Sequence, residues 1–114
     1  MRVGHSMGKL MVDAVNWGDV AKSDYSQDFP CMNTNYKEFS WAFEIDKEFA
    51  DFAAMQSFEK TTIKSYFSNR EKNVSYNGLV ENNSILVSYK RKEIRGVYPT
   101  VIATYEVVFT KENA

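Results

Sequence analysis

The sequence predicts an α+β fold in which N-terminal helices pack on a curved antiparallel sheet of three to four strands. Two observations favour this class: apolar residues recur at helical spacing in the N-terminal half, and three runs rich in β-branched and aromatic residues follow Asn73. With 114 residues, the chain is long enough for one hydrophobic core but not for two. We therefore expect a single domain over residues 1–114, with residues 1–8 as a flexible terminus.

The first expected element is a short amphipathic helix from Gly8 to about Lys22. Its apolar stripe follows helical spacing and consists of Leu10, Met11, Ala14, Val15 and Gly18. The next stretch, "KSDYSQDFPCMNTN", collects Ser, Asp and Asn, and Pro30 disfavours a helix there. A loop is therefore expected between about Lys22 and Asn35.

The apolar segment after this loop supports two structures. In residues 38–45 the large apolar side chains fall on every second position, which is the spacing of a strand, but several of them also fit a helix. From Asp46 onward we expect a helix, because Asp46 suits an N-cap and Glu48 lies in the first turn. The apolar stripe continues through Tyr66, and the helix is expected to end near Ser68.

Three antiparallel strands are expected after Asn73, in the runs "NVSYNGLVE", "SILVSYKRKEIRG" and "TVIATYEVVFT". The letters "ENNS" predict the turn between the first two. In the middle run we expect the start, near Ile85, to be buried and the end, "KRKEIRG", to project into solvent. In the last run alternate residues share a face, and the face expected to meet the helices contains Val101, Ala103, Tyr105, Val107 and Phe109.

The charge balance argues against a generic nucleic-acid-binding protein. The net charge is −1, whereas such proteins are usually basic. Residues 1–56 carry 5 Lys/Arg and 9 Asp/Glu, a net charge of −4, and residues 57–114 carry 9 and 6, a net charge of +3. The two halves are therefore suited to different partners, or to each other.

Residues 4 to 8 read "GHSMG", the G-x-S-x-G pattern that carries the nucleophilic serine in many lipases and esterases. That serine needs a preceding strand and a separate histidine base. Here only three residues precede Gly4, and the single histidine, His5, is adjacent to Ser6. We interpret the pattern as a chance match and expect no catalysis by Ser6.

No cofactor or metal site is expected. His5 and Cys31 are the only histidine and cysteine, and they do not make a zinc ligand set. Asp24 and Asp28 lack the glycine and terminal glutamate of a calcium loop, and no phosphate-binding GxxxxGK[ST] pattern occurs. Cys31 cannot form an internal disulfide, and we interpret it as a buried structural thiol.

An aromatic pocket around a carboxyl group would permit acid–base chemistry, because burial raises the pKa of a carboxyl group. The candidate acids and bases are Glu44, Asp46, Tyr105 and Glu106, and the expected lining residues are Trp41, Phe43 and Tyr105. The competing interpretation is that these carboxylates lie on an ordinary solvated surface.

The most binding-like feature is a basic cluster with aromatic neighbours. The predicted protein-binding residues are Tyr89, Lys90, Arg91, Lys92, Arg95 and Tyr98. Clustered positive charge suits phosphates, and aromatic rings stack on bases, so nucleic acid is a second interpretation, which the net charge disfavours. The interpretation that the residues favour over both is a solvated hairpin tip or edge, because Glu93 interrupts the cluster and charges protect strand edges from pairing.

The chain resembles the periplasmic domain of the inner-membrane assembly factor of type IV secretion and conjugation systems. The resemblance covers about residues 46–110 and rests on the order of elements: a long helix ending in "IKSYFSN", then "NVSYNGLVENNSILVSYKRKE" and "TVIATYEVVF". That family is similar in fold to nuclear transport factor two. The resemblance implies a domain that follows one membrane helix, makes protein contacts and dimerises without catalysis.

The leading functional prediction is a non-catalytic protein–protein interaction module, an assembly component of a secretion or conjugation machine that forms a homodimer. The alternative is a small inhibitor or immunity-type protein that binds and blocks an enzyme, because compact size and uneven charge suit it equally. A small-molecule binder or enzyme with the aromatic pocket is the third prediction. The expected location is periplasmic if the resemblance holds and cytoplasmic otherwise, with membrane contact only through an anchor upstream of this chain.

Overall fold

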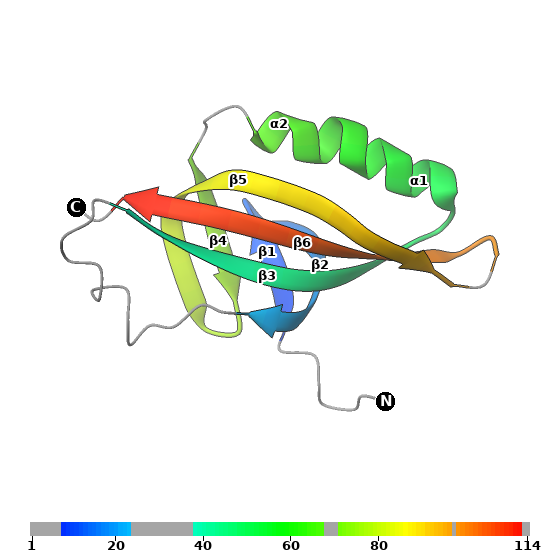
Figure 1. Ribbon diagram of the computed structural model, residues 1–114, viewed down its shortest axis with the longest axis horizontal. Helices are drawn as coiled ribbons and strands as arrows, with labels where there is room; N and C mark the ends of the chain where they lie inside the picture. Colours follow the sequence, from blue (N-terminus) through cyan, green and yellow to red (C-terminus); the bar gives the residue numbers. More distant parts are fainter. Residues whose placement is uncertain (1–7, 24–37, 68–70, 97, 113–114) are drawn as a thin grey trace.

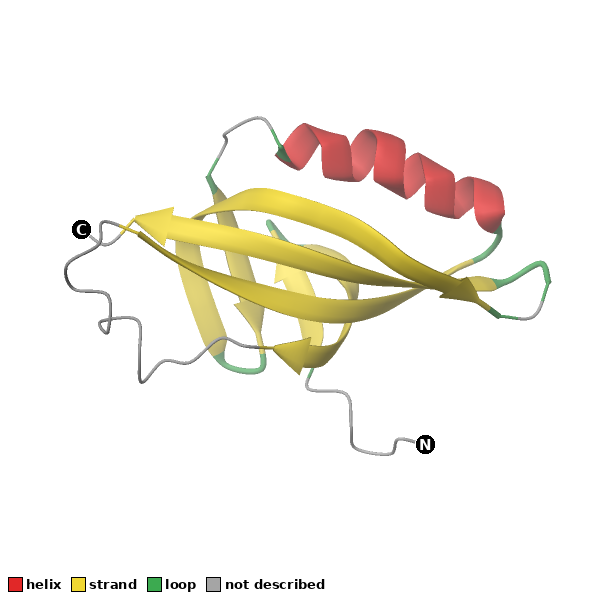
Figure 2. Cartoon of the chain, in the orientation of Figure 1, coloured by secondary structure: helices red, strands yellow, loops and turns green. Residues whose placement is uncertain are grey.

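The computed structural model describes residues 8–23, 38–67, 71–96 and 98–112. Within these residues the chain forms a closed antiparallel barrel of six strands and one helical segment (Figure 1). The predicted α+β class, with N-terminal helices packed on a three- to four-stranded sheet, is therefore wrong. Figure 2 shows that strands dominate and that the helical segment of the described chain lies between strands rather than before them.

The strands are β1 (Lys9–Val12), β2 (Val15–Ser23), β3 (Glu38–Phe49), β4 (Lys72–Tyr76), β5 (Leu79–Arg95) and β6 (Val101–Glu112). The helical segment consists of α1 (Phe52–Ser57), the π-helical turn η2 (Phe58–Ile63) and α2 (Lys64–Tyr66). Around the barrel the order is β1-β2-β3-β6-β5-β4, and the pairing of β4 with β1 closes the ring. The helical segment runs beside β5 (Figure 1).

A β-hairpin replaces the first predicted helix. β1 and β2 pair across a tight turn in which Asp13 and Ala14 both have positive φ, 51° and 68°. This is the backbone conformation of a two-residue hairpin turn, but Asp-Ala is not its usual sequence. Burial in the barrel decides the structure, because Leu10 and Val12 are fully buried whereas Val15, on the predicted helical stripe, is exposed.

The segment with two possible structures is a strand, and it extends past the predicted helix start. β3 pairs with β6 over its whole length, from Glu38 opposite Glu112 to Phe49 opposite Val101. The helix begins at Phe52 instead of near Asp46. Its N-cap is Asp51, whose Oδ1 accepts a 2.8 Å hydrogen bond from the backbone N–H of Ala54.

The helical segment buries Met55, Ile63 and Tyr66 against the strands. Its middle turn, η2, is π-helical, a rare geometry with i→i+5 hydrogen bonds that adds a residue to one turn. Phe58 and Glu59, the first two residues of this turn, are both partly buried.

The C-terminal strands are present, but the first predicted turn is displaced. β5 is continuous through "ENNS", and the chain turns instead at Asn77 and Gly78, both with positive φ. Asn-Gly is the preferred sequence for such a hairpin turn. The face of β6 that was expected to meet the helices points into the barrel instead, and four of its five residues are fully buried there: Ala103, Tyr105, Val107 and Phe109.

The core is aromatic and centres on Trp17, a fully buried residue of β2. Its indole packs edge-on against Tyr66 and Phe58 of the helical segment, with ring centroids 5.1 and 6.3 Å away. It also contacts Phe109 of β6 at 6.0 Å and Tyr89 of β5 at 6.3 Å. One side chain therefore joins the helical segment to opposite parts of the barrel.

The substitution Gly18→Ala is expected to destabilise the protein by about 3 kcal/mol or more. Gly18 has φ +139°, and a Cβ there would lie 2.6 Å from the backbone oxygen of Asp46 on β3. The matched control is Gly78→Ala, where φ is +89° but a Cβ would meet nothing within 4 Å. That variant should lose only about 1–2 kcal/mol. Urea unfolding measures both, and equal losses would show that the β2–β3 approach tolerates a side chain.

Candidate functional site

The structure separates the six predicted protein-binding residues. β5 contains bulges, because its register against β6 shifts between Leu86 and Ser88 and again between Arg91 and Glu93. Tyr89 stacks inside the barrel on Tyr105, and Arg91 contacts the helical segment. The outward-facing residues are Lys90, Lys92 and Arg95, while Tyr98 lies in the β5–β6 turn.

Glu59 anchors a polar cluster between the helical segment and the barrel. The Arg91 Nη1 donates to both carboxylate oxygens of Glu59, at 2.8 and 2.9 Å, and the Tyr105 hydroxyl donates to Oε2 at 2.6 Å. Arg91 Nη1 also lies 3.9 Å from the sulfur of Met55. The rings of Tyr105 and Tyr89 stack at 4.7 Å. These contacts hold η2 against β5 and β6.

Electrostatics keep both tyrosines of this cluster protonated. Burial and the hydrogen bond to Glu59 raise the pKa of Tyr105 well above its usual range. Burial and the neighbouring Tyr105 raise the pKa of Tyr89 further. A phenol in this state donates a hydrogen bond but does not act as a base at neutral pH. The cluster is thus suited to fixing the helical segment rather than to proton abstraction.

The carboxylates predicted as acids or bases lie on the opposite side of the sheet from the predicted aromatic pocket. Trp41, Phe43 and Tyr105 point into the barrel and are buried. Alternation along β3 and β6 places Glu44, Asp46 and Glu106 on the other face. Of the predicted aromatic lining, only Phe43 borders the same cavity as Glu44 and Glu106, whereas Trp41 and Tyr105 do not.

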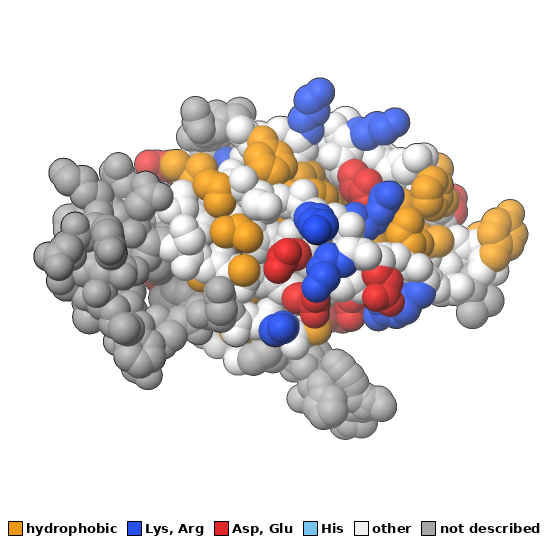
Figure 3. All heavy atoms as spheres, viewed as in Figure 1, with side chains coloured by type: hydrophobic (Ala, Val, Ile, Leu, Met, Phe, Trp, Pro, Cys, Tyr) orange, Lys and Arg blue, Asp and Glu red, His pale blue; other side chains and the backbone are white. Residues whose placement is uncertain are grey.

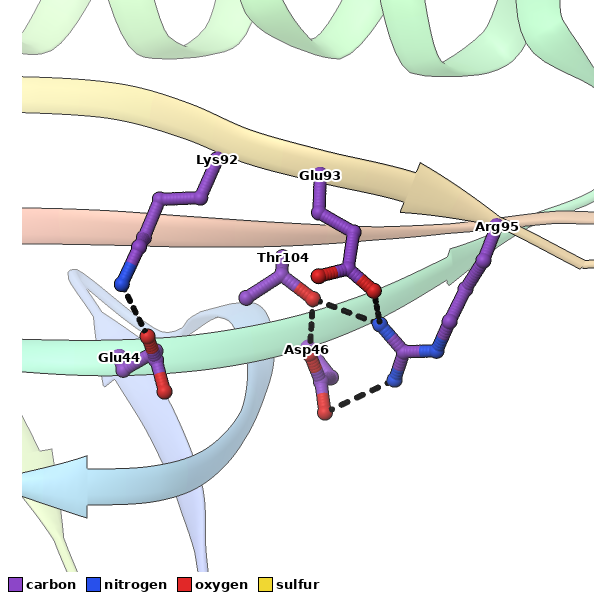
Figure 4. Close-up of polar contacts among 6 residues, drawn as sticks. All are labelled: Glu44, Asp46, Lys92, Glu93, Arg95 and Thr104. Atoms are coloured by element: carbon purple, nitrogen blue, oxygen red, sulfur yellow. Dashed lines mark hydrogen bonds and ion pairs between the residues drawn. The ribbon is translucent and has the colours of Figure 1, made fainter.

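Glu44 and Asp46 instead join an ion-pair network on the outer face of β3, β6 and β5 (Figure 4). Lys92 Nζ lies 2.7 Å from Glu44 Oε2, and this contact raises the pKa of the Lys92 ammonium. Asp46 accepts from the Thr104 hydroxyl at 2.6 Å and pairs with Arg95 at 3.3 Å. The basic residues of β5 therefore meet acidic residues of β3 across β6, and Figure 3 shows mixed charges over the middle of this face.

A groove of about 220 Å³ opens on the same face. It lies where the register of β2 against β3 shifts between Val20 and Lys22. Its lining residues are Lys22, Ser23, Ala42, Phe43, Glu44, Lys92 and Glu106. Both charges are represented equally, so the groove is not a selective anion or cation site.

Three exposed apolar side chains gather at one end of the molecule. Phe52 begins α1 just after β3, Ile94 lies near the end of β5, and Tyr98 lies in the β5–β6 turn with 93% of its surface exposed. The pairing of Phe49 with Val101 brings these segments to the same end. We call Phe52, Ile94 and Tyr98 the tip patch; hydrophobic side chains are visible at this projecting end in Figure 3.

Sequence reasoning missed two of the residues that matter here, Glu59 and Phe52. Glu59 lies four residues from both Met55 and Ile63, so helical spacing places its carboxylate on the same face as these two buried side chains. A carboxylate on a buried face could have been recognised from the sequence. Phe52 carried no such signal, because its exposure depends on where the helix begins.

Several earlier candidates lie outside the described residues: His5, Ser6, Asp24, Asp28 and Cys31. Across residues 8–23, 38–67, 71–96 and 98–112, no three His, Cys, Asp or Glu side chains are grouped so that they could hold a metal ion. In that same part of the chain, no helix has the length and apolar character needed to cross a membrane.

No family model, curated protein or solved structure matches this chain significantly. The resemblance to the type IV secretion assembly factor therefore stays a prediction from the sequence. The barrel differs from the helix-on-sheet arrangement that this resemblance implies.

Glu59→Gln is expected to lower the free energy of unfolding by about 1–2 kcal/mol, because charge-assisted hydrogen bonds are stronger than neutral ones. The substitution keeps the shape of the side chain but removes the charge that faces Arg91. Glu44→Gln is the matched control: it breaks a similar pair with Lys92 on the outer face and should cost clearly less, because water screens an exposed ion pair. Chemical denaturation gives both values. Equal losses would mean that Glu59 has no special role in holding the helical segment.

Proposed function

We propose that this chain is a non-catalytic protein-binding module that docks a partner through the tip patch. The observation that carries the proposal is the exposure of Tyr98, at 93%, in the turn of the long β5–β6 hairpin. Exposed apolar groups that gather on one surface commonly mark interaction sites. Tyrosine is also among the residues that contribute most to binding energy in protein interfaces.

The surroundings of Tyr98 support this choice. Antiparallel pairing of β5 with β6, up to Arg95 opposite Ile102, gives the turn a rigid base, so little conformational entropy is lost when a partner binds. Ile94 and Phe52 extend the apolar surface, while the neighbouring Arg95 is paired with Asp46. A partner would meet an apolar centre with polar groups at its rim, which is the usual anatomy of a protein interface.

The non-catalytic part of the proposal rests on the state of the candidate chemical groups. Tyr105 donates to Glu59, which Arg91 also contacts, and Glu44 and Asp46 are held by basic partners. A general acid or base must have its proton or lone pair available to substrate. In these clusters the phenol proton and the carboxylate oxygens are already engaged by other side chains of the protein.

A small inhibitor of an enzyme is the second candidate, and one observation favours it. Tyr98 is a single aromatic side chain at the end of a narrow hairpin, and such a projection fits into the cleft of an enzyme. The two candidates differ in the partner: an inhibitor lowers the activity of the enzyme that it captures, whereas an assembly component leaves catalysis unchanged. A place in a secretion or conjugation machine stays a prediction from the resemblance.

Tyr98→Ser is expected to reduce recovery of the physiological partner about tenfold or more, because it removes the central apolar contact. The tagged chain is used as bait in a lysate of its source organism, and bound proteins are quantified by mass spectrometry. Val80→Ser is the matched control, since Val80 is 64% exposed but belongs to a different part of β5. A partner recovered equally by both variants, or no partner recovered by the unmodified chain, would contradict docking through the tip patch.

A further inference from the structure

The turn between β4 and β5 consists of Asn77 and Gly78, the one Asn-Gly pair in the sequence. Both residues are exposed, and a Cβ added at Gly78 would meet nothing within 4 Å. Among the described residues, no hydrogen bond holds the carboxamide of Asn77. An unrestrained side-chain amide and an unhindered backbone nitrogen therefore lie next to each other at the surface.

We propose that Asn77 is a site of spontaneous deamidation, in which the chain modifies its own backbone. The backbone nitrogen of Gly78 loses its proton and attacks Cγ, the side-chain carbonyl carbon of Asn77. The new N–Cγ bond closes a succinimide ring, and the Cγ–Nδ2 bond breaks as Nδ2 takes up a proton and leaves as ammonia. Water then opens the ring: cleavage at Cγ gives aspartate, and cleavage at the main-chain carbonyl gives isoaspartate. Water is consumed and ammonia is released, so the step needs no oxidant or reductant.

The conformation of the turn favours this attack. Asn77 and Gly78 have φ of +44° and +89°, as in a type I′ hairpin turn. Rotation of the peptide plane between them gives type II′, which also joins antiparallel strands and keeps φ positive at the first residue. In type II′ the ψ of that residue is about −120°. The Gly78 nitrogen then lies on the same side as the Asn77 Cβ, within reach of Cγ, and the hairpin stays in place.

Glycine at position 78 matters for both parts of this argument. It has no Cβ to hinder its own nitrogen, and its backbone adopts the φ values of both turn types without strain. The peptide rotation that the attack requires is therefore open to Gly78, whereas a residue with a side chain would resist it.

The other asparagines of the described chain lack this combination, because none of them precedes a glycine. Asn16 Oδ1 accepts a 2.9 Å hydrogen bond from a backbone N–H two residues further on, and the next residue, Trp17, is fully buried. Asn83 is exposed and has a positive φ of 62°, but Ser84 after it is fully buried and paired in the sheet. Asn83 is therefore an internal control, since it shares exposure and positive φ with Asn77 but is not followed by glycine.

Isoaspartate in this turn acts on the closure of the barrel. Its main chain runs through Cβ and Cγ and is longer by one carbon, whereas the length of a hairpin turn sets the strand register. The first pair beyond the turn is Tyr76 with Leu79, and the Tyr76 ring packs edge-on against Phe43 with centroids 5.0 Å apart. In the described chain, β4 closes the ring through two residue pairs with β1, which involve Val74 and Ser75. Deamidation therefore disturbs the seam that has the fewest paired residues.

The modified turn lies at the opposite end of β5 from the β5–β6 turn and its tip patch (Figure 1). The inference rests on the chemistry of Asn77 and Gly78 and not on partner docking. Each proposal can therefore fail without the other.

Peptide mapping by mass spectrometry of the full chain, aged at physiological temperature, tests the site. Conversion at Asn77 should be about tenfold or more faster than at Asn83, because the accessible rotation lowers the barrier. It should also be faster at mildly alkaline than at neutral pH, since the attacking nitrogen must lose its proton. Gly78→Ala, which the open space around this position allows to fold, should slow conversion about tenfold. Equal rates at Asn77 and Asn83, or an unchanged rate in Gly78→Ala, would overturn the proposal.

Urea unfolding of the separated products tests the effect on the barrel. Asn77→Asp is the matched control, because it adds the same negative charge without the extra main-chain carbon, and Asp-Gly is also a preferred hairpin turn. The isoaspartate form should unfold at a lower urea concentration than Asn77→Asp, which should unfold close to the unmodified chain. Equal midpoints for the isoaspartate form and Asn77→Asp would overturn the effect on barrel closure.

Discussion

The pairing of β3 with β6 is the constraint on which the rest of the structure depends. Twelve consecutive residue pairs, from Glu38–Glu112 to Phe49–Val101, run without a register shift. Because side chains alternate along a strand, this one register decides which residues enter the barrel and which form the outer face. It also brings the end of β3, where the helical segment begins, to the same place as the β5–β6 turn.

The helical segment is attached to this framework in two chemically different ways. Trp17 packs against the rings of Phe58 and Tyr66, and Glu59 receives hydrogen bonds from Arg91 and Tyr105. The apolar contacts supply burial, and the polar contacts specify orientation, since a carboxylate accepts donors only in defined directions. Phe58 and Glu59 are consecutive residues of the π-helical turn, and both are partly buried. The outer face and the tip patch lie outside these contacts.

Sequence reasoning was most accurate where a pattern is set by one neighbouring element. The inward face of β6 was predicted correctly because a half-buried strand shows clear alternation. The N-terminal hairpin was missed because Leu10, Ala14 and Val15 also satisfy a helical period, and because the turn at Asp13–Ala14 lacks the usual glycine. The residues of the predicted binding cluster are close in sequence but do not lie together in the structure. Ordinary alternation along β5 directs Lys90 and Arg91 to opposite sides of the sheet.

The sequence by itself determined the existence of the C-terminal strands, the inward face of β6 and the presence of a helix between residues 52 and 66. These depend on local spacing of apolar side chains, which is readable from one segment at a time. Only the tertiary structure decided that residues 9–23 form a hairpin and that Glu59 meets Arg91. The same holds for the ion pairs that join β5 to β3 on the outer face. The physical reason is that barrel closure pairs segments far apart in the chain, and burial across those pairs outweighs local helical preference.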